Sequence, residues 1–392
     1  MTEEMCKEGL FIFKKKWLIF PAIFLLSIQF FSEVPFLYKL DQTGLKHILA
    51  VAICFWGLCT DVRGFQIKIR NFSSEIKTVC MVTAALVFIS FIYMFVNGFS
   101  FGWISEMYYL LVPVFFVYSI FKYDCSIEHL EKIMDMFLYS MIFGFIFFIL
   151  KRISAGQLGT VSFLDSSSPF EIECAHIFLM LYIFYTFENN TWKRILSGFF
   201  CVLAWKRVCL LYLVFVTLFH GRISREKPVS KYLLMAMTLG LVLLPTVVQL
   251  ILTDGFSNWF TAATGLDLHK FLMFRFETIV TAFESGVPSR GLGTYLYVDV
   301  PWYDHFVRVS IHNDAVRLYL ETSAAGLLIF AGGMSSIVKK QYSFIVMLFM
   351  FIEMSVSHFL GNGSLPFWIV AYSMIFCFNR YPQGSSRMIE ME

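Results

Sequence analysis

Residues 195–219 read ILSGFFCVLAWKRVCLLYLVFVTLF, an apolar stretch about as long as one membrane span that is interrupted near its centre by Lys206 and Arg207. A single helix over this stretch would leave two cations at bilayer depth, where a charged side chain is costly. Two short helices that turn at Lys206-Arg207 avoid that cost. The sequence therefore predicts a break in the chain at these two residues.

The composition of the whole chain is typical of a membrane protein. Of the 392 residues, 58% are hydrophobic, 19% are aromatic and 15% are charged, whereas soluble domains are roughly 25% charged. This excludes a soluble enzyme, a nucleic-acid-binding protein and a disordered chain. We expect a single integral membrane domain over 1–392, all-α in class, with about twelve transmembrane segments. The apolar runs that define them are 17–32, 45–60, 78–97, 103–121, 133–150, 172–187, 195–204, 208–219, 232–252, 318–338, 342–360 and 366–379.

The basic residues indicate how these segments are oriented, because short cytoplasmic loops collect Lys and Arg. If the chain turns at Lys206-Arg207, most of the 31 Lys and Arg residues fall on one side of the membrane. That side is then cytoplasmic and holds both termini. One large external loop, 253–317, remains between the ninth and tenth segments.

The external loop contains an amphipathic pattern. Four large apolar residues recur in it at helical spacing: Leu272, Phe276, Ile279 and Phe283. They predict an amphipathic helix over 270–284 that lies at the membrane surface.

Two arginines of the same loop could be functional, and each also has an ordinary structural interpretation. Arg275 lies on the polar side of the predicted helix, beside Glu277. The simplest interpretation of Arg275 is therefore a solvated surface charge. Arg290 precedes Gly291-Leu292-Gly293, whose backbone N–H groups can cradle phosphate oxygens. An ordinary loop is the alternative there.

Ionisable residues at membrane depth are functional candidates by default. Under the predicted topology they collect toward the outer face: Glu106, Glu173, Arg207 and His358, with Arg275, Arg290, Asp304, His305 and His312 in the external loop. Arg207 can face an anion at the outer leaflet, and snorkelling of Lys206 and Arg207 to lipid phosphates fits the spacing equally well. His312 is a natural general base because histidine titrates near neutral pH; a structural histidine is the alternative. His305 and His269 are weaker candidates.

Cysteine spacing and metal-ligand motifs indicate no metal. The nine cysteines form no CxxC pair, and the chain contains neither DxD nor HExxH. The sequence thus predicts neither a disulfide framework nor a zinc site. We expect no metal and no cofactor.

Taken in order, these features resemble the O-antigen polymerase and ligase superfamily (Wzy and WaaL types), polytopic glycosyltransferases of the GT-C kind. The similarity covers roughly 195–335. It rests on Arg207, on Phe274-Arg275-Phe276-Glu277, on Gly291-Leu292-Gly293, and on His312-Asn313 followed by Leu318-Tyr319-Leu320-Glu321 and Ala325-Gly326-Leu327-Leu328.

The chain departs from the family pattern at two places. Trp205 and Lys206 precede the first arginine, where small residues are common in the family. The E-x-G-x-x-G pattern after the histidine has Ser323 in place of a glycine. Both departures affect how tightly the chain packs at these positions more than they affect the chemistry that the resemblance implies.

The resemblance implies an O-antigen repeat-unit polymerase at the periplasmic face of a bacterial inner membrane. Such an enzyme transfers an undecaprenyl-diphosphate-linked glycan onto a lipid-linked repeat unit, without a metal and with inversion. Its partners would be this lipid-linked oligosaccharide and membrane lipids, with no nucleic acid, and the resemblance also allows a chain-length regulator. The open alternatives are an O-antigen ligase, which uses lipid A–core as acceptor, and a lipid-linked oligosaccharide flippase.

The resemblance also implies a role for each candidate residue. Arg207 and Arg275 would bind the diphosphate, because the guanidinium fork matches phosphate geometry and is always ionised. His312 would accept the proton of the attacking hydroxyl. The remaining substrate-binding candidates are Lys206, Arg290 and Asn313.

Overall fold

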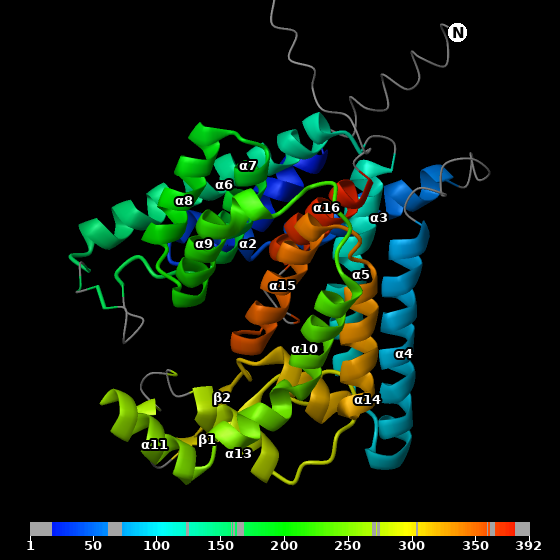
Figure 1. Cartoon of the computed structure of the whole chain (residues 1–392), viewed down its shortest axis with the longest axis vertical. Coiled ribbons are helices and arrows are strands. Elements are labelled where there is room, and N and C mark those ends of the chain that lie inside the picture. The colour runs from blue at the N-terminus through cyan, green and yellow to red at the C-terminus, as the bar shows by residue number, and fades with distance from the viewer. Residues whose placement is uncertain are drawn as a thin grey trace, which may run out of the picture.

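The computed structural model describes residues 18–61, 73–122, 125–157, 159, 161–162, 168–268, 272, 275–302, 305–358, 360 and 365–380. The chain is mostly helical (Figure 1). Each apolar run identified in the sequence contains a helix. These helices are Leu18–Phe31, α3 (Leu45–Asp61), α4 (Ser73–Asn97), α5 (Gly102–Phe121), α6 (Ile127–Ser154), α7 (Ala175–Phe187), α8 (Thr191–Leu203), α9 (Arg207–Phe219), α10 (Lys231–Ile251), α14 (Asp314–Ser336), α15 (Gln341–Val356) and α16 (Leu365–Arg380).

Five of these helices are long and apolar enough to cross a membrane: α4, α5, α6, α10 and α14. The short helix α2 (Pro35–Asp41) and the first part of α3 form a further candidate span that is bent by 44°. The expectation of a helical membrane protein is confirmed at this level.

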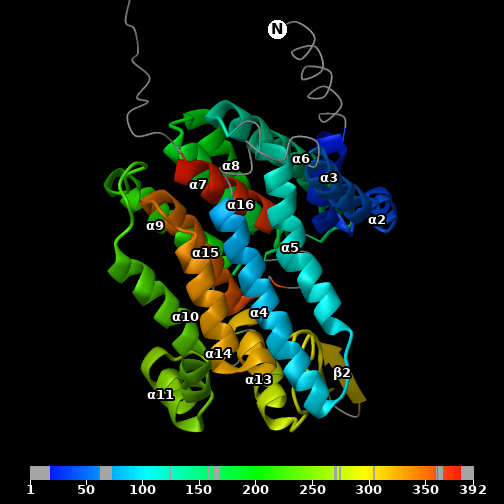
Figure 2. The ribbon, with the colours of Figure 1, turned by 90° about the vertical axis from the view of Figure 1, so that its right-hand side faces the viewer.

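The burial of each helix follows from the distribution of its apolar residues. In α7 and α16 the apolar residues surround the helix, and both are buried inside the bundle, as expected for helices without a polar face. By contrast, α4 and α10 expose large apolar side chains such as Phe88, Phe95 and Leu243, which is typical of a surface that faces lipid. The long helices α4, α5, α10 and α14 run along the length of the molecule (Figures 1 and 2), with α14 packed against α4 and α10.

The predicted external loop is folded rather than extended, and it lies at one end of the molecule (Figure 1). It contains the helices α11 (Asp254–Thr264) and α13 (Arg275–Glu284). It also contains an antiparallel hairpin of β1 (Val298–Trp302) and β2 (His305–Val309), in which Val298 is paired with Val309. The expectation of an all-α chain omitted this hairpin. Helix α14 begins at Asp314, so the last four residues assigned to the loop, 314–317, form the first turn of a helix.

Helix α13 covers the last ten of the fifteen residues of the amphipathic helix predicted over 270–284. Its apolar face packs on the chain itself: Ile279 is buried in a small separate core together with Val248, Tyr295 and Ile311. We expected this face to rest on the membrane surface. The hairpin and the end of α10 supply the apolar partners that a sequence pattern alone does not reveal.

Helix α14 is interrupted at Ser323, the position where the family pattern has a glycine. Ser323 has φ +65° and ψ 177° inside the helix. This conformation is one that essentially only glycine adopts without strain. The helix is therefore kinked at a residue that carries a side chain.

Candidate functional site

The stretch 195–219 is broken as predicted. Helix α8 ends at Leu203, Trp205 takes a left-handed conformation with φ +51°, and α9 begins at Arg207. The backbone carbonyl of Ala204 accepts a hydrogen bond from the N–H of Ile172 at 3.1 Å. Because the break is tied to a neighbouring segment, Lys206 and Arg207 have defined positions.

A cavity of about 480 Å³ lies beside this break. Of the six residues to which the resemblance gives a role, all except Arg290 line it: Lys206, Arg207, Arg275, His312 and Asn313. These residues come from the break, from α13 and from the start of α14. Much of the remaining lining is apolar and includes Val208, Leu211, Val248, Ile251, Phe256 and Phe260. The cavity thus combines cations with a hydrophobic wall.

The cations of the cavity differ in their partners. Lys206 forms an ion pair with Glu171, with 3.1 Å between Nζ and Oε1. Arg275 donates a hydrogen bond to the backbone carbonyl of Val356. Burial lowers the pKa of Arg275 from its ordinary value, and the charge of Arg207 lowers it further. Arg275 is therefore not a solvated surface charge: in a partly buried space it interacts with the like charge of Arg207 and with the carboxylates of Glu353, Glu171 and Glu173.

His312 lies between β2 and α14. Its Nδ1 atom is 2.9 Å from Nδ1 of His358, and the two rings meet edge to face. Burial lowers the pKa of His312 to about 3, helped by the neighbouring His358 and Arg275. The imidazole is therefore neutral near pH 7.

Asn313 contacts the cavity, but its side chain is already used by the fold. It is the N-cap of α14: its side-chain oxygen accepts a hydrogen bond from the N–H of Val316 at 2.9 Å, and its amide nitrogen donates to the carbonyl of Ser355 at 2.8 Å. A cap of this kind fixes the start of a helix. Asn313 thus has a structural role, which is to fix the start of α14 and the position of the adjacent His312.

Arg290 does not join the other predicted site residues. It is exposed, and the Gly291-Leu292-Gly293 turn after it packs against α4 and α5. The N–H of Leu292 donates to the hydroxyl of Ser90 at 2.9 Å, so it is not available to a phosphate. A Cβ on Gly291 would lie 2.3 Å from Cβ of Ser90. The glycines therefore serve close packing of backbones and do not form a phosphate cradle.

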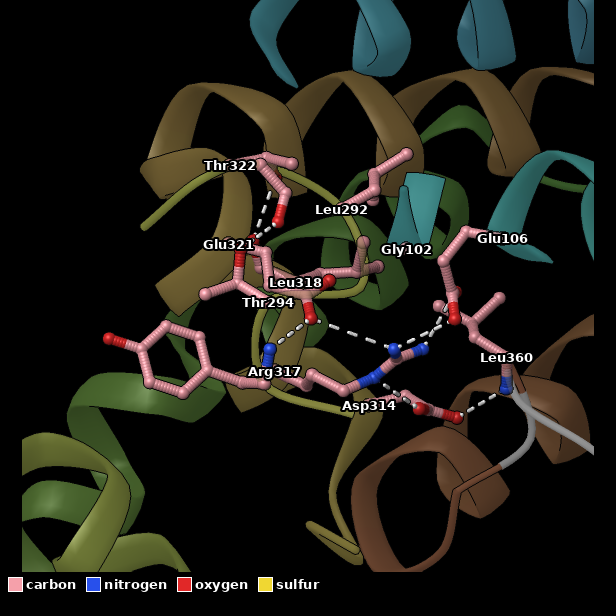
Figure 3. A network of polar contacts seen from close by, with 12 residues as sticks. Gly102, Glu106, Leu292, Thr294, Asp314, Arg317, Leu318, Glu321, Thr322 and Leu360 are labelled. Carbon is pink, nitrogen blue, oxygen red and sulfur yellow. Dashed lines mark hydrogen bonds and ion pairs between the residues drawn. The ribbon is translucent and has the colours of Figure 1, made fainter. Parts of the chain in front are cut away.

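Glu106, predicted as a functional residue, instead belongs to a buried ion-pair network (Figure 3). The guanidinium of Arg317 binds both of its carboxylate oxygens, at 3.0 and 2.9 Å. Arg317 also contacts Asp314 at 3.2 Å and Glu321 at 3.7 Å. All four side chains are at most 2% exposed. Arg317 was assigned to the external loop, and no spacing in the sequence links it to a residue more than 200 positions away.

Three further ionisable side chains meet beside the cavity, and no pattern in the sequence indicated that they form a group: His176 and Glu353 line the cavity, and Cys209 is buried next to them. Nδ1 of His176 lies 2.9 Å from Oε1 of Glu353 and 3.2 Å from Sγ of Cys209. The sulfur of Cys209 is 3.8 Å from the same carboxylate oxygen. Among the described residues, these are the ones whose donor atoms are grouped closely enough to hold a metal ion.

The other candidates are less informative. Glu173 interacts electrostatically with both His358 and His312, so it belongs to the surroundings of the cavity. His269 and Asp304 lie outside the described residues, and the structure describes only the backbone of His305, which begins β2.

Comparisons with protein-family models, with curated proteins and with solved structures give no match for this chain. The fold and the cavity alone define its class: a helical membrane protein with a partly apolar cavity that contains two arginines and a neutral histidine.

Proposed function

We propose that the protein is an O-antigen repeat-unit polymerase, or a polymerase of a related surface polysaccharide. It transfers an undecaprenyl-diphosphate-linked glycan onto a lipid-linked repeat unit. The observation that carries this proposal is that Arg207, Arg275 and His312, far apart in the sequence, line one cavity.

The two arginines suit the diphosphate of the donor. Two guanidinium groups in a half-buried space favour a ligand with more than one negative charge, and the planar fork of arginine matches phosphate oxygens. The apolar residues of α10 and α11, such as Val248 and Phe256, suit the lipid chain attached to the diphosphate. A cavity with both properties fits a lipid diphosphate better than a free nucleotide sugar.

The proposed reaction is a displacement at the anomeric carbon. The acceptor hydroxyl oxygen attacks this carbon, and its proton passes to the neutral imidazole of His312. The bond between the anomeric carbon and the diphosphate oxygen breaks, and undecaprenyl diphosphate leaves with the bonding electrons. Arg207 and Arg275 stabilise the charge that develops on the leaving group. The anomeric configuration inverts, and no divalent ion bridges the enzyme and the diphosphate.

We further propose that the chain crosses the inner membrane about twelve times, with both termini in the cytoplasm and the cavity open to the periplasm. The helix within each apolar run and the break at Lys206-Arg207 support this topology. The folded segment with α11, α13 and the hairpin would then be periplasmic.

The experiment that tests this function is a transfer assay with full-length protein purified in detergent. It receives a lipid-diphosphate-linked repeat unit, either alone or together with lipid A–core. A ladder of polymer from the repeat unit alone supports the polymerase. Transfer to lipid A–core with no ladder indicates the ligase. If no glycosidic bond forms with either acceptor while vesicles containing the protein translocate the lipid, the flippase replaces both.

A further inference from the structure

Helices α7, α8, α9 and α15 meet around a second cluster of chemically reactive side chains, next to the cavity. His176 is 5% exposed, and Cys201, Cys209 and Glu353 are fully buried. The thiol of Cys209 interacts with that of Cys201, and the thiol of Cys201 lies 3.7 Å from the carbonyl of Ala175, the residue before His176. An imidazole, a carboxylate and two thiols are thus gathered at one point.

The geometry points to a binding site for a Zn²⁺-like transition-metal ion, with His176, Cys209 and Glu353 as its protein ligands. Zinc binds nitrogen and oxygen at about 2.0–2.2 Å and sulfur at about 2.3 Å, so its tetrahedral ligand atoms lie about 3–4 Å from one another. The distances among Nδ1 of His176, Sγ of Cys209 and Oε1 of Glu353 are 2.9, 3.2 and 3.8 Å.

A second observation points the same way. Oε2 of Glu353 is buried and has no hydrogen-bond partner among the described residues. An unsatisfied oxygen of a buried carboxylate is costly. A divalent cation shared by this carboxylate, His176 and the Cys209 thiol would compensate for that cost, and thiolate with imidazole selects zinc-like ions over Mg²⁺ or Ca²⁺.

The position of the cluster gives the ion a structural role. His176 belongs to α7, Cys209 to α9 and Glu353 to α15. An ion bound by all three would fasten these helices to one another. Arg207 lies two residues before Cys209, so the ion would also hold this arginine at the cavity. The proposed transfer reaction needs no metal of its own.

The test is metal analysis of the full-length protein purified in detergent, after incubation with Zn²⁺ and removal of unbound ion. We expect about one zinc per chain, because a buried site with thiolate ligands binds zinc tightly. The Cys209→Ala and His176→Ala proteins should each lose most of it. Cys377→Ala is the matched control: this cysteine is also buried, in α16, and its replacement should leave the zinc in place.

A spectroscopic measurement tests the site if the alanine variants fold poorly. With Co²⁺ in place of zinc, the wild-type protein should show a thiolate-to-metal charge-transfer band, which Cys209→Ser should weaken strongly. The proposal is overturned if the wild-type protein retains no zinc, if Cys209→Ala retains all of it, or if thiol titration finds Cys201 and Cys209 joined in a disulfide. None of these measurements uses the transfer assay, so their outcome does not depend on the proposed function.

Discussion

The Nδ1 atoms of His312 and His358 lie 2.9 Å apart, so a single proton joins the two imidazole rings. If this proton is on His312, its Nε2 carries a free lone pair and can act as a base. If the proton is on His358, Nε2 of His312 carries a hydrogen and cannot accept another. The neighbour therefore determines whether His312 is in the tautomer that the proposed reaction requires.

We expect His358 to act as a positioning residue for His312. His358→Leu removes the acceptor for the Nδ1–H of His312 and should lower kcat about ten- to hundred-fold, the usual effect of losing a group that orients a histidine. His358→Asn, whose side-chain oxygen can accept the same hydrogen bond, should keep more of the activity. The check is transfer kinetics with both variants and with His312→Ala, which should be inactive. Equal rates for the Leu and Asn variants would contradict the orienting role.

The low pKa of His312 predicts how stability depends on pH. This pKa is about 3 in the folded protein and about 6.5 in an unfolded chain. Between these values the unfolded chain binds more protons, so the contribution of His312 to stability is fully present above about pH 6.5 and is lost as the pH falls toward 3. His312→Gln, which does not titrate, should lose less stability between about pH 7 and pH 5. Thermal unfolding in detergent measures this, and identical pH dependence in the two proteins would refute it.

Binding of the lipid donor should depend on the two cavity arginines. Arg207→Ala and Arg275→Ala should each weaken binding of a lipid diphosphate about ten-fold or more, because a hydrogen bond to a charged group contributes ~1.5–3 kcal/mol. Arg207→Lys should recover only part of the affinity, since it keeps the charge but loses the fork. Arg290→Ala is the control, because this exposed arginine lies away from the cavity. Direct measurements of lipid-diphosphate binding test this prediction. If Arg290→Ala lowers the affinity as much as the other two substitutions do, the cavity is not the binding site.

The buried ion pair between Glu106 and Arg317 should matter for folding rather than for chemistry. Glu106→Ala leaves the buried guanidinium without its bidentate partner and should reduce the free energy of unfolding by about 3–5 kcal/mol. The control is Glu33→Ala, which removes a half-exposed partner of Arg152 and should cost ~0–1 kcal/mol. Thermal unfolding of the purified variants tests this, and a loss for Glu106→Ala no larger than the loss for Glu33→Ala would contradict the expectation.

The strained backbone at Ser323 predicts a stabilising substitution. Ser323→Gly removes the side chain from a conformation that costs about 1–3 kcal/mol for residues other than glycine, so the unfolding temperature should rise. Ser336→Gly, in regular helix at the end of the same α14, should instead lower it slightly, because glycine disfavours helix. A drop in unfolding temperature for Ser323→Gly would show that its hydroxyl or Cβ stabilises the kink.

Local features of the chain were predictable from the sequence because they depend on neighbouring residues. Apolar runs of sufficient length form helices in lipid, where each backbone polar group must be satisfied within its own segment. Two cations cannot sit in the middle of one span, so the break at Lys206-Arg207 followed directly. The spacing of Ile279 and Phe283 predicted α13, because apolar residues that recur at this interval lie on one face of a helix.

The contacts between distant residues were decided by the tertiary structure. The resemblance to a family suggested Arg207, Arg275 and His312, but only the packing of α9, α13 and α14 brings them to one cavity. The pairing of Glu106 with Arg317, and the grouping of His176, Cys209 and Glu353, leave no pattern in the sequence. Their separation along the chain is arbitrary, because helix packing fixes which side chains meet and places no constraint on how many residues lie between them.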